Sequence, residues 1–525
     1  MRAINVLLAI LVSLIMGAAV FEGGLRLIGL GPKPTLNQFD PVMGWSKKPN
    51  LELNREHPDA PFKIEFKLNS MGLRDDEITE KKPDDVFRVL ALGDSFTLGF
   101  GVNREDLFVD ILEGWWNAEG RRVEVINAGT EGYSTDQEVA WLETVGASLD
   151  PDLVLLFPYE NDIYWNGRDN YNGREKPRYN LDGSREVRTF TRPPEPTCAD
   201  SFALTAKFFG RKKGKLARED FFKPSGASQM ILSEWGSVMV NAPNFMETPT
   251  SRTRGALKAL KAACDSVGAA VLVAPIPSHS AIDAEYAPKF ATKYLAGLPS
   301  GSWSADKPVD TFITLSNAAG IQPIDCRTAF KQLTSNGTAL YYDTDWHLNA
   351  EGNHAFAQVL HDEIDQLGIF PADRRGPESA ITKPARVEPK ASLFGVPALF
   401  LALWTLLTIM YLVTYKDEPR WQPPLKVGAL LASMFGIVLG THKLLSILPP
   451  KIGHVLLITG LLLLFGFIVY KLGRRLGTIA ELFKAFTLRG HWYLMPLVVI
   501  LLTIGSLLVV AASSPLIAPF IYTLF

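Results

Sequence analysis

Four long apolar stretches in the last third of this 525-residue chain constrain its fold more than any other feature. Each is about twenty residues long, which is the length an α-helix needs to cross the hydrocarbon core of a bilayer. Helices buried in a soluble core keep a polar stripe, which these stretches lack. The sequence therefore predicts a C-terminal membrane domain over 392–525, with spans at Leu393–Tyr415, Val427–Leu448, Ile452–Tyr470 and Trp492–Ala512.

A further apolar run, Ile4–Val20, stands near the amino terminus behind Arg2. A cleaved signal peptide has a similar pattern, and small residues at 17–19 could serve as a cleavage site. The apolar character continues beyond them without a clear cleavage signature. We therefore favour an uncleaved transmembrane anchor over residues 1–30.

The charges between the C-terminal stretches predict an orientation. The loops after the first and third stretches are rich in Lys and Arg, whereas the second holds only Lys443 and Lys451. Because cytoplasmic loops carry the excess of positive charge, the first and third loops are expected inside the cell and the chain before Leu393 outside. The sequence thus predicts a bacterial inner-membrane protein whose polar middle lies in the periplasm.

The composition excludes several other classes of protein. The chain holds 53 Lys and Arg against 55 Asp and Glu, so it lacks the basic excess of a nucleic-acid binder, and we expect no nucleic-acid partner. Its three cysteines include no C-x-x-C pair, which excludes a disulfide framework and argues against a thiolate zinc site. Cys264 and Cys326 could form one bridge in an oxidising compartment, but the sequence does not pair them, and Cys198 is a third candidate.

Short apolar runs alternate with amphipathic segments between residues 86 and 375. Strands are expected at Phe87–Leu92, Arg122–Asn127, Leu153–Phe157 and Ala269–Ala274, and helices at Asp136–Val145, Thr253–Val267 and Ala350–Leu367. Apolar strands separated by helices favour a parallel sheet covered on both faces, whose ligands bind beyond the carboxyl ends of the strands. The sequence thus predicts an α/β catalytic domain over 86–375, preceded by an extension over 31–85.

Residues 165–245 interrupt this pattern and are rich in Tyr, Arg, Pro and Asn, so we interpret them as an insertion over the strand ends. Their basic run, Lys207–Arg218, could hold an anionic glycan or lipid headgroups, although a solvated surface is the simpler interpretation. The stretch 376–391 is rich in Pro and charge and is expected to link the two domains.

Ser95 is the candidate nucleophile, because Gly93-Asp94-Ser95 directly follows the first strand. The glycine permits a tight turn that presents the serine at the start of a helix, where the amino terminus favours a developing negative charge. The tripeptide alone is a weak signal, and Thr97 rules out the G-x-S-x-G motif of α/β-hydrolases.

A serine nucleophile needs a base that a carboxylate orients. Near the end of the domain, Asp345 and His347 stand two positions apart, and such residues point to the same side of an extended segment. His347 is therefore the candidate base and Asp345 the candidate acid, with Asp343 as an alternative acid. A metal site at these residues is a weaker alternative, so we expect neither a metal nor a cofactor.

Acyl transfer also needs donors for an oxyanion. Backbone N–H groups at Gly132, in the turn after the second strand, and the side-chain amide of Asn161, after the third, are candidates. Each alone is an ordinary turn residue. Together with Ser95 and His347, at strand ends and in this order, they indicate a serine acyl-transfer site.

These residues resemble the sequence blocks of the SGNH, or GDSL-type, hydrolases. Gly93-Asp94-Ser95 resembles the first block, Gly132 the second, Asn161-Asp162 the third and Asp345 with His347 the last. The resemblance implies a three-layer α/β/α fold of flavodoxin-like type over about 86–367. It also implies nucleophile Ser95, base His347 and an oxyanion hole formed by the amides of Ser95 and Gly132 and the side chain of Asn161.

Two positions depart from the family pattern. Tyr159 replaces the glycine of the third block, and Thr344 breaks the usual D-x-x-H spacing of the last. The D-x-H spacing is similar to that of polysaccharide O-acetyltransferases related to alginate acetylation. Asp40–Trp45 and Asn69–Arg74 also resemble the membrane-anchored members of that branch, and His491–Phe525 resembles small membrane proteins of the same gene neighbourhoods.

Three hypotheses follow. The first is a membrane-anchored periplasmic serine O-acyltransferase that transfers acetyl groups to a cell-surface polysaccharide, with the acyl donor delivered by a membrane-bound O-acyltransferase and with membrane lipid around its anchors. The second is a carbohydrate or lipid esterase with the same triad. The third is a non-catalytic glycan-binding or scaffold subunit of a membrane acyltransferase complex.

Overall fold

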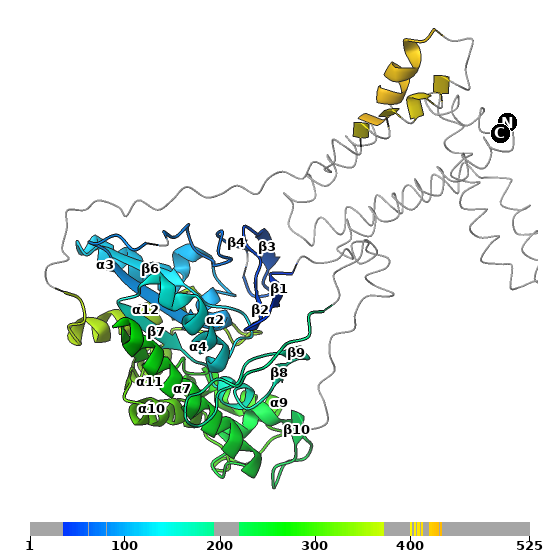
Figure 1. Cartoon of the computed structure of the whole chain (residues 1–525). Helices are drawn as coiled ribbons and strands as arrows, with labels where there is room; N and C mark the ends of the chain where they lie inside the picture. The colour runs from blue at the N-terminus through cyan, green and yellow to red at the C-terminus, as the bar shows by residue number, and fades with distance from the viewer. Residues whose placement is uncertain are drawn as a thin grey trace, which may run out of the picture. The chain divides into compact units, whose positions relative to one another are not determined.

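The computed structural model describes residues 35–193 except 61 and 80, residues 220–371, and part of 400–432 (Figure 1). The first two ranges belong to one compact unit and the described residues from 400 onward to another. Within these residues, no helix combines the length and apolar character that crossing a membrane requires. Several predicted segments lie outside the described residues: the anchor 1–30, the basic run 207–218, the linker 376–391, the third and fourth spans, and most residues of the first two.

A five-stranded parallel sheet forms the centre of the larger unit. Its strands, in chain order, are β5 (Phe87–Gly93), β6 (Val123–Asn127), β7 (Leu153–Phe157), β12 (Ala270–Val273) and β13 (Gln322–Pro323). In space they follow the order β6-β5-β7-β12-β13, which is the flavodoxin-like order. The predicted parallel α/β domain is therefore confirmed, and its first four strands lie within about one residue of the predicted ranges.

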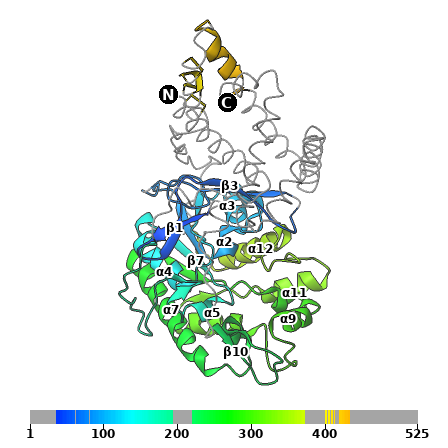
Figure 2. The same ribbon diagram turned by 90° about the vertical axis from the view of Figure 1, so that its right-hand side faces the viewer.

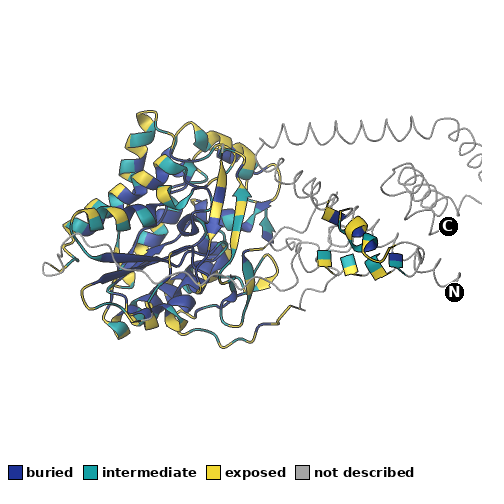
Figure 3. Cartoon of the chain, turned by 90° about the horizontal axis from the view of Figure 1, so that it is seen from above, coloured by how far each residue is buried: buried dark blue, intermediate teal, exposed yellow. Residues whose placement is uncertain are grey.

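Helices cover both faces of this sheet. Along the strands, side chains alternate between two apolar cores, so that Val89 and Leu155 face one and Leu90 and Leu156 the other. The first core is covered by α3 (Phe108–Ala118), α11 (Arg327–Ser335) and α12 (Ala350–Gln366), and the second by α4 (Thr135–Thr144), α7 (Glu247–Val267) and α10 (Lys307–Ala318). Figure 3 shows the result, with buried residues in the strands and on the inner sides of the helices.

Local sequence explains where two of these helices begin. Asn349 caps α12, because its side chain accepts a hydrogen bond from the Gly352 N–H at 2.9 Å. Helix α7 begins at Glu247, earlier than the predicted start at Thr253. Pro249 therefore lies in the first turn of α7. Proline is tolerated there because the N–H groups of a first turn have no acceptor within the helix.

The extension before the sheet folds into two hairpins. They consist of β1 (Asn37–Asp40) with β2 (Gly44–Lys47), and β3 (Glu52–Glu56) with β4 (Lys63–Lys67). Phe66 packs with Leu98 of α2 (Ser95–Leu98), and the buried guanidinium of Arg74 donates to the carbonyls of Leu98 and Gly99 at 3.0 and 2.6 Å. The extension thus lies against α2, the helix that begins at Ser95 (Figure 2).

Residues 165–193 and 220–245 form short elements rather than long ones. These are β8 (Asn170–Tyr171), β9 (Arg174–Glu175), β10 (Phe221–Phe222), β11 (Ile231–Leu232), η5 (Ser233–Val238) and η6 (Asn244–Met246). The remaining elements of the domain are η1 (Arg104–Asp106), η2 (Gly146–Leu149), α5 (Asp162–Trp165), α8 (His279–Ile282) and α9 (Tyr286–Tyr294).

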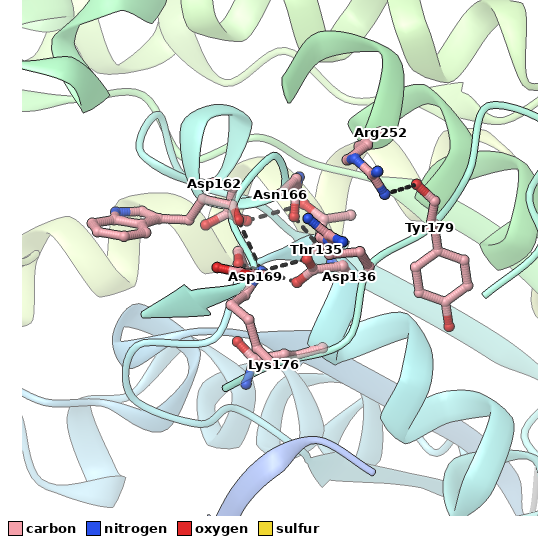
Figure 4. A network of polar contacts seen from close by, with 12 residues as sticks. Thr135, Asp136, Asp162, Asn166, Asp169, Lys176, Tyr179 and Arg252 are labelled. Carbon is pink, nitrogen blue, oxygen red and sulfur yellow. Dashed lines mark hydrogen bonds and ion pairs between the residues drawn. The ribbon is translucent and has the colours of Figure 1, made fainter. Parts of the chain in front are cut away.

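A buried polar network ties the first of these segments to the domain (Figure 4). The fully buried Lys176 forms an ion pair with Asp136 of α4 and donates to the Trp165 carbonyl at 2.9 Å. Asn166 accepts from the Asp136 N–H at 3.1 Å and donates to the Thr253 hydroxyl at 3.0 Å. The segment after Trp165 is therefore anchored in the domain by its own buried cation.

The bridge considered between Cys264 and Cys326 is absent, because both are buried free cysteines. Cys264 lies on α7 in the core on one face of the sheet, and Cys326 lies in the core on the other. The sheet separates the two thiols, so no disulfide can join them. Cys198 lies outside the described residues.

Candidate active site

Three of the predicted site residues follow three adjacent strands. Ser95 begins α2 one residue after β5, Gly132 lies in the turn after β6, and Asn161 follows β7. Because β6 and β7 flank β5 in a parallel sheet, these residues belong to one sheet edge. His347 reaches the same place from the loop before α12, where the Tyr342 N–H donates to the His347 carbonyl at 3.2 Å.

The imidazole of His347 connects the serine to the acid. Its Nε2 lies 2.7 Å from Ser95 Oγ, and its Nδ1 lies 2.5 Å from Asp345 Oδ1. An ionised carboxylate only accepts hydrogen bonds, so Nδ1 carries the proton and Nε2 accepts from the Ser95 hydroxyl. Ser95 is itself partly exposed.

Asp345 is the acid that orients this base. Burial acts to raise its pKa, but hydrogen bonds from His347 and His57 outweigh that effect and lower the pKa to about 2. The carboxylate therefore stays ionised at neutral pH. Among the described residues, the alternative acid Asp343 has no hydrogen bond with His347 and instead acts electrostatically on His279.

Position 93, in the turn before Ser95, cannot hold a residue larger than glycine. A Cβ at Gly93 would lie 2.1 Å from Thr97 Oγ1, so only glycine fits there. Asp94 is buried and accepts a hydrogen bond from the Phe96 N–H at 2.9 Å, which fixes the first turn of α2. Burial raises the pKa of Asp94 to about 6.

Candidate oxyanion donors lie at Ser95 itself and after the two strands that flank β5. Within the described part of the chain, the N–H groups of Ser95 and Gly132 have no protein acceptor, and neither does the side-chain amide of Asn161. Gly132 has a φ of +73°, which residues with a Cβ rarely adopt, and a Cβ there would lie 2.8 Å from the Tyr171 ring. All three donors are thus unused by the fold and can serve a developing oxyanion.

Tyr159, which replaces the family's glycine, packs into the core beside the catalytic residues. Its ring centroid lies 4.5 Å from that of Phe96, which in turn lies 4.7 Å from that of His347. The departure from the family pattern therefore adds an aromatic contact next to the base.

His57, which no sequence motif indicates, contacts the acid from the extension. Its Nε2 lies 3.2 Å from Asp345 Oδ2. The two residues are 288 positions apart, and no motif surrounds His57, so only a structure could bring them together.

Lys47 is a second residue that was not predicted, and it contacts the turn that leads to Gly132. Its Nζ donates to the Gly129 carbonyl and to Thr130 Oγ1, the latter at 2.6 Å. Burial lowers the pKa of Lys47 to about 7, although the charge of Glu131 acts to raise it. The neighbouring Arg55 forms an ion pair with Glu131 at 3.0 Å, so β2 and β3 both hold this turn.

Comparison with known families gives two matches. Residues 237–396, which include Asp345 and His347, match the family described as "SGNH hydrolase-like domain, acetyltransferase AlgX". Residues 476–525 match a family of unknown function, DUF5989. No curated protein matches the sequence.

Solved structures similar to this chain include TesA and two acetyl xylan esterases. TesA is 12% identical and AlAXEase, an acetyl xylan esterase, 16%; each aligns with 53% of this chain, over 99% and 100% of its own length, at TM-scores of 0.30 and 0.31. Axe2, an acetylxylan esterase from Geobacillus stearothermophilus, is 13% identical over 53% of this chain and 94% of its own, at a TM-score of 0.31.

The parallel sheet, the serine turn and the family match together define an SGNH hydrolase-like domain. Within that class, the matched family is that of the AlgX acetyltransferase domain. The chain thus carries an SGNH-type esterase or acyltransferase.

Proposed function

We propose that this chain is a membrane-anchored periplasmic serine O-acyltransferase, which moves an acetyl group onto a cell-surface polysaccharide through an acyl-Ser95 intermediate. The observation that carries the proposal is the hydrogen-bonded series from Ser95 Oγ through His347 to Asp345, with distances of 2.7 and 2.5 Å. This arrangement matches the requirement for an activated serine nucleophile.

In the first half-reaction His347 Nε2 removes the Ser95 proton while Oγ attacks the carbonyl carbon of the acyl donor. The carbonyl oxygen becomes negative and accepts hydrogen bonds from the N–H groups of Ser95 and Gly132 and from the amide of Asn161. The intermediate then expels the donor's alkoxide or thiolate, which takes the proton from His347. Acyl-Ser95 remains.

In the second half-reaction a sugar hydroxyl replaces the leaving group. His347 Nε2 removes its proton while the oxygen attacks acyl-Ser95, and the collapsing intermediate returns that proton to Ser95 Oγ. Asp345 stays ionised throughout and stabilises the imidazolium that forms in each half.

Two considerations favour a sugar over water as the acceptor. The matched family is named for an acetyltransferase. The predicted anchors at both ends of the chain would also keep the site close to a membrane-borne donor and so raise its effective concentration. The scaffold hypothesis would leave an assembled Ser–His–Asp triad without a use.

The test follows a labelled acetyl group. The full chain is incubated with p-nitrophenyl [14C]acetate and de-O-acetylated polysaccharide from the source cells, with Ser95→Ala as the matched control. Label that enters the polysaccharide and depends on Ser95 supports the transferase. Label recovered only as free acetate would show that the chain is an esterase. Equal transfer and equal hydrolysis of the label by the wild type and by Ser95→Ala would favour the non-catalytic scaffold.

A further inference from the structure

His57 gives the catalytic acid a second hydrogen bond. Asp345 Oδ1 accepts hydrogen bonds from the ring Nδ1 and from the backbone N–H of His347, at 2.5 and 3.1 Å. The other carboxylate oxygen, Oδ2, lies 3.2 Å from His57 Nε2. The side chain of His57 is only 2% exposed, so water does not compete freely for this contact. Both oxygens of the carboxylate are therefore held by histidines.

The backbone fixes which ring nitrogen of His57 carries the proton. The Asp59 N–H donates to His57 Nδ1 at 3.3 Å, so Nδ1 acts as an acceptor. In a neutral imidazole the other nitrogen is then the donor. His57 Nε2–H therefore donates a hydrogen bond to Asp345 Oδ2. Because the acceptor is an ionised carboxylate, this bond is charge-assisted.

The same short segment also holds the rest of the catalytic loop. Asp59 Oδ2 accepts from the Thr344 N–H at 2.9 Å and from the Thr344 hydroxyl at 2.7 Å. The ring centroid of His57 lies 4.3 Å from the ring centroid of Tyr342. Residues 57–59 of the extension thus contact the catalytic loop on both sides of Asp343, at Tyr342 and at Thr344.

We propose that His57 is a positioning residue for Asp345, and that the extension thereby completes the active site. This inference rests on the proposed function, because it gives His57 a task in the serine reaction. A carboxylate held through one oxygen can rotate out of the imidazole plane. The bond from His57 keeps Oδ1 on His347 Nδ1 while the imidazolium forms, when that contact matters most.

The test compares His57→Leu with His57→Gln in the full chain, using p-nitrophenyl acetate. Leucine is similar in size but removes the donor, so kcat should fall about tenfold or more, with KM nearly unchanged. Glutamine offers an amide N–H in place of Nε2–H and should restore most of kcat. His354→Leu, on exposed α12 surface, is the matched histidine control and should behave as the wild type.

A double-mutant cycle separates positioning from folding. In an Asp345→Asn background His57→Leu should cause no further loss, because its effect passes through the acid. Equal losses in both backgrounds, or a His57→Gln variant as impaired as His57→Leu, would overturn the assignment. A wild-type chain with neither esterase activity nor labelling of Ser95 would refute the proposed function itself, whereas an active wild type with a fully active His57→Leu refutes only the role of His57.

Discussion

His347 Nε2 lies 2.7 Å from Ser95 Oγ although 252 positions separate the two residues. Each is held by a separate part of the fold. Ser95 begins α2 one residue after the central strand β5, and His347 sits in a loop that is closed by the pairing of Tyr341 with Leu348. Because both parts belong to the folded domain, the catalytic contact exists before a substrate arrives, which is the condition for preorganised catalysis.

The two candidate acids can be separated by matched variants. Asp345→Asn removes the carboxylate that orients His347, so kcat for p-nitrophenyl acetate should fall by about 10³–10⁴-fold. Asp343→Asn, two positions away, should stay within about twofold of the wild type, because among the described residues Asp343 makes no hydrogen bond to the base. A larger loss for Asp343→Asn than for Asp345→Asn would contradict the assignment of the acid.

Asp94 should make stability depend on pH. Its pKa is raised to about 6 in the folded protein, from an ordinary value near 3.8. The native state therefore holds this proton more tightly than the unfolded state, so the contribution of Asp94 is fully present below about pH 4 and is lost as the pH rises through 6.

Asp94→Asn removes that titration and keeps an acceptor for the Phe96 N–H. Urea unfolding at pH 4, 5 and 7 should show the variant gaining stability relative to the wild type as pH rises, by on the order of 2 kcal/mol in total. A difference that stays constant over this range would mean that Asp94 is not shifted.

Lys47 should affect catalysis although it is remote from the triad in sequence. Lys47→Met leaves the Gly129 carbonyl and the Thr130 hydroxyl without their buried donor, which should disturb the turn that carries Gly132. We expect kcat to fall about tenfold, as for a weakened oxyanion donor. Lys48→Met, at the next position with an exposed contact to Thr35, is the control and should keep its activity.

The lowered pKa of Lys47 predicts a second dependence of stability on pH, opposite in sign to that of Asp94. The pKa of Lys47 is lowered to about 7 from 10.5, so between these values the unfolded state binds more protons than the native state. Wild-type stability should therefore gain from Lys47 as pH rises from 7 toward 10, and Lys47→Met should lack this gain. Unfolding midpoints of both proteins at pH 7, 8.5 and 10 measure it, and parallel pH curves would contradict it.

The buried pair between Lys176 and Asp136 should be essential for stability. Lys176→Met leaves Asp136 without its buried partner, a change that costs about 3–5 kcal/mol in comparable sites. Adding Asp136→Asn should recover part of the loss, because it removes the uncompensated charge. Lys258→Met, an exposed lysine on α7, should not change the melting temperature, and a similar loss there would point to a general effect.

The sequence predicted the parts of this domain that carry strong local signals. β7 and β12 are continuous apolar runs, and β5 and β6 are mostly apolar, as expected for strands of a parallel sheet that is covered on both faces. Each of the four strands was found within about one residue of its predicted range. Ser95, Asp345 and His347 were predicted because their chemistry needs these residue types next to strand ends or two positions apart. The structure brings all three together.

Features without a local signal were not predicted. Strand β13 has only two residues and includes Pro323, which cannot donate to a sheet ladder. His57 lies between exposed residues and Lys47 ends a short hairpin strand, and their partners lie 288 and 82 positions away. Burial of such residues depends on tertiary packing, so neither hydrophobic period nor motif spacing could reveal it.

Labelling with a fluorophosphonate probe tests the central claim most directly, because the probe reacts only with an activated serine. The full chain is treated with the probe, digested and mapped by mass spectrometry, alongside Ser95→Ala and His347→Ala. We expect the adduct on Ser95, no adduct in Ser95→Ala and much slower labelling in His347→Ala. A folded wild-type chain whose Ser95 stays unmodified, or labels equally fast without His347, would contradict the account.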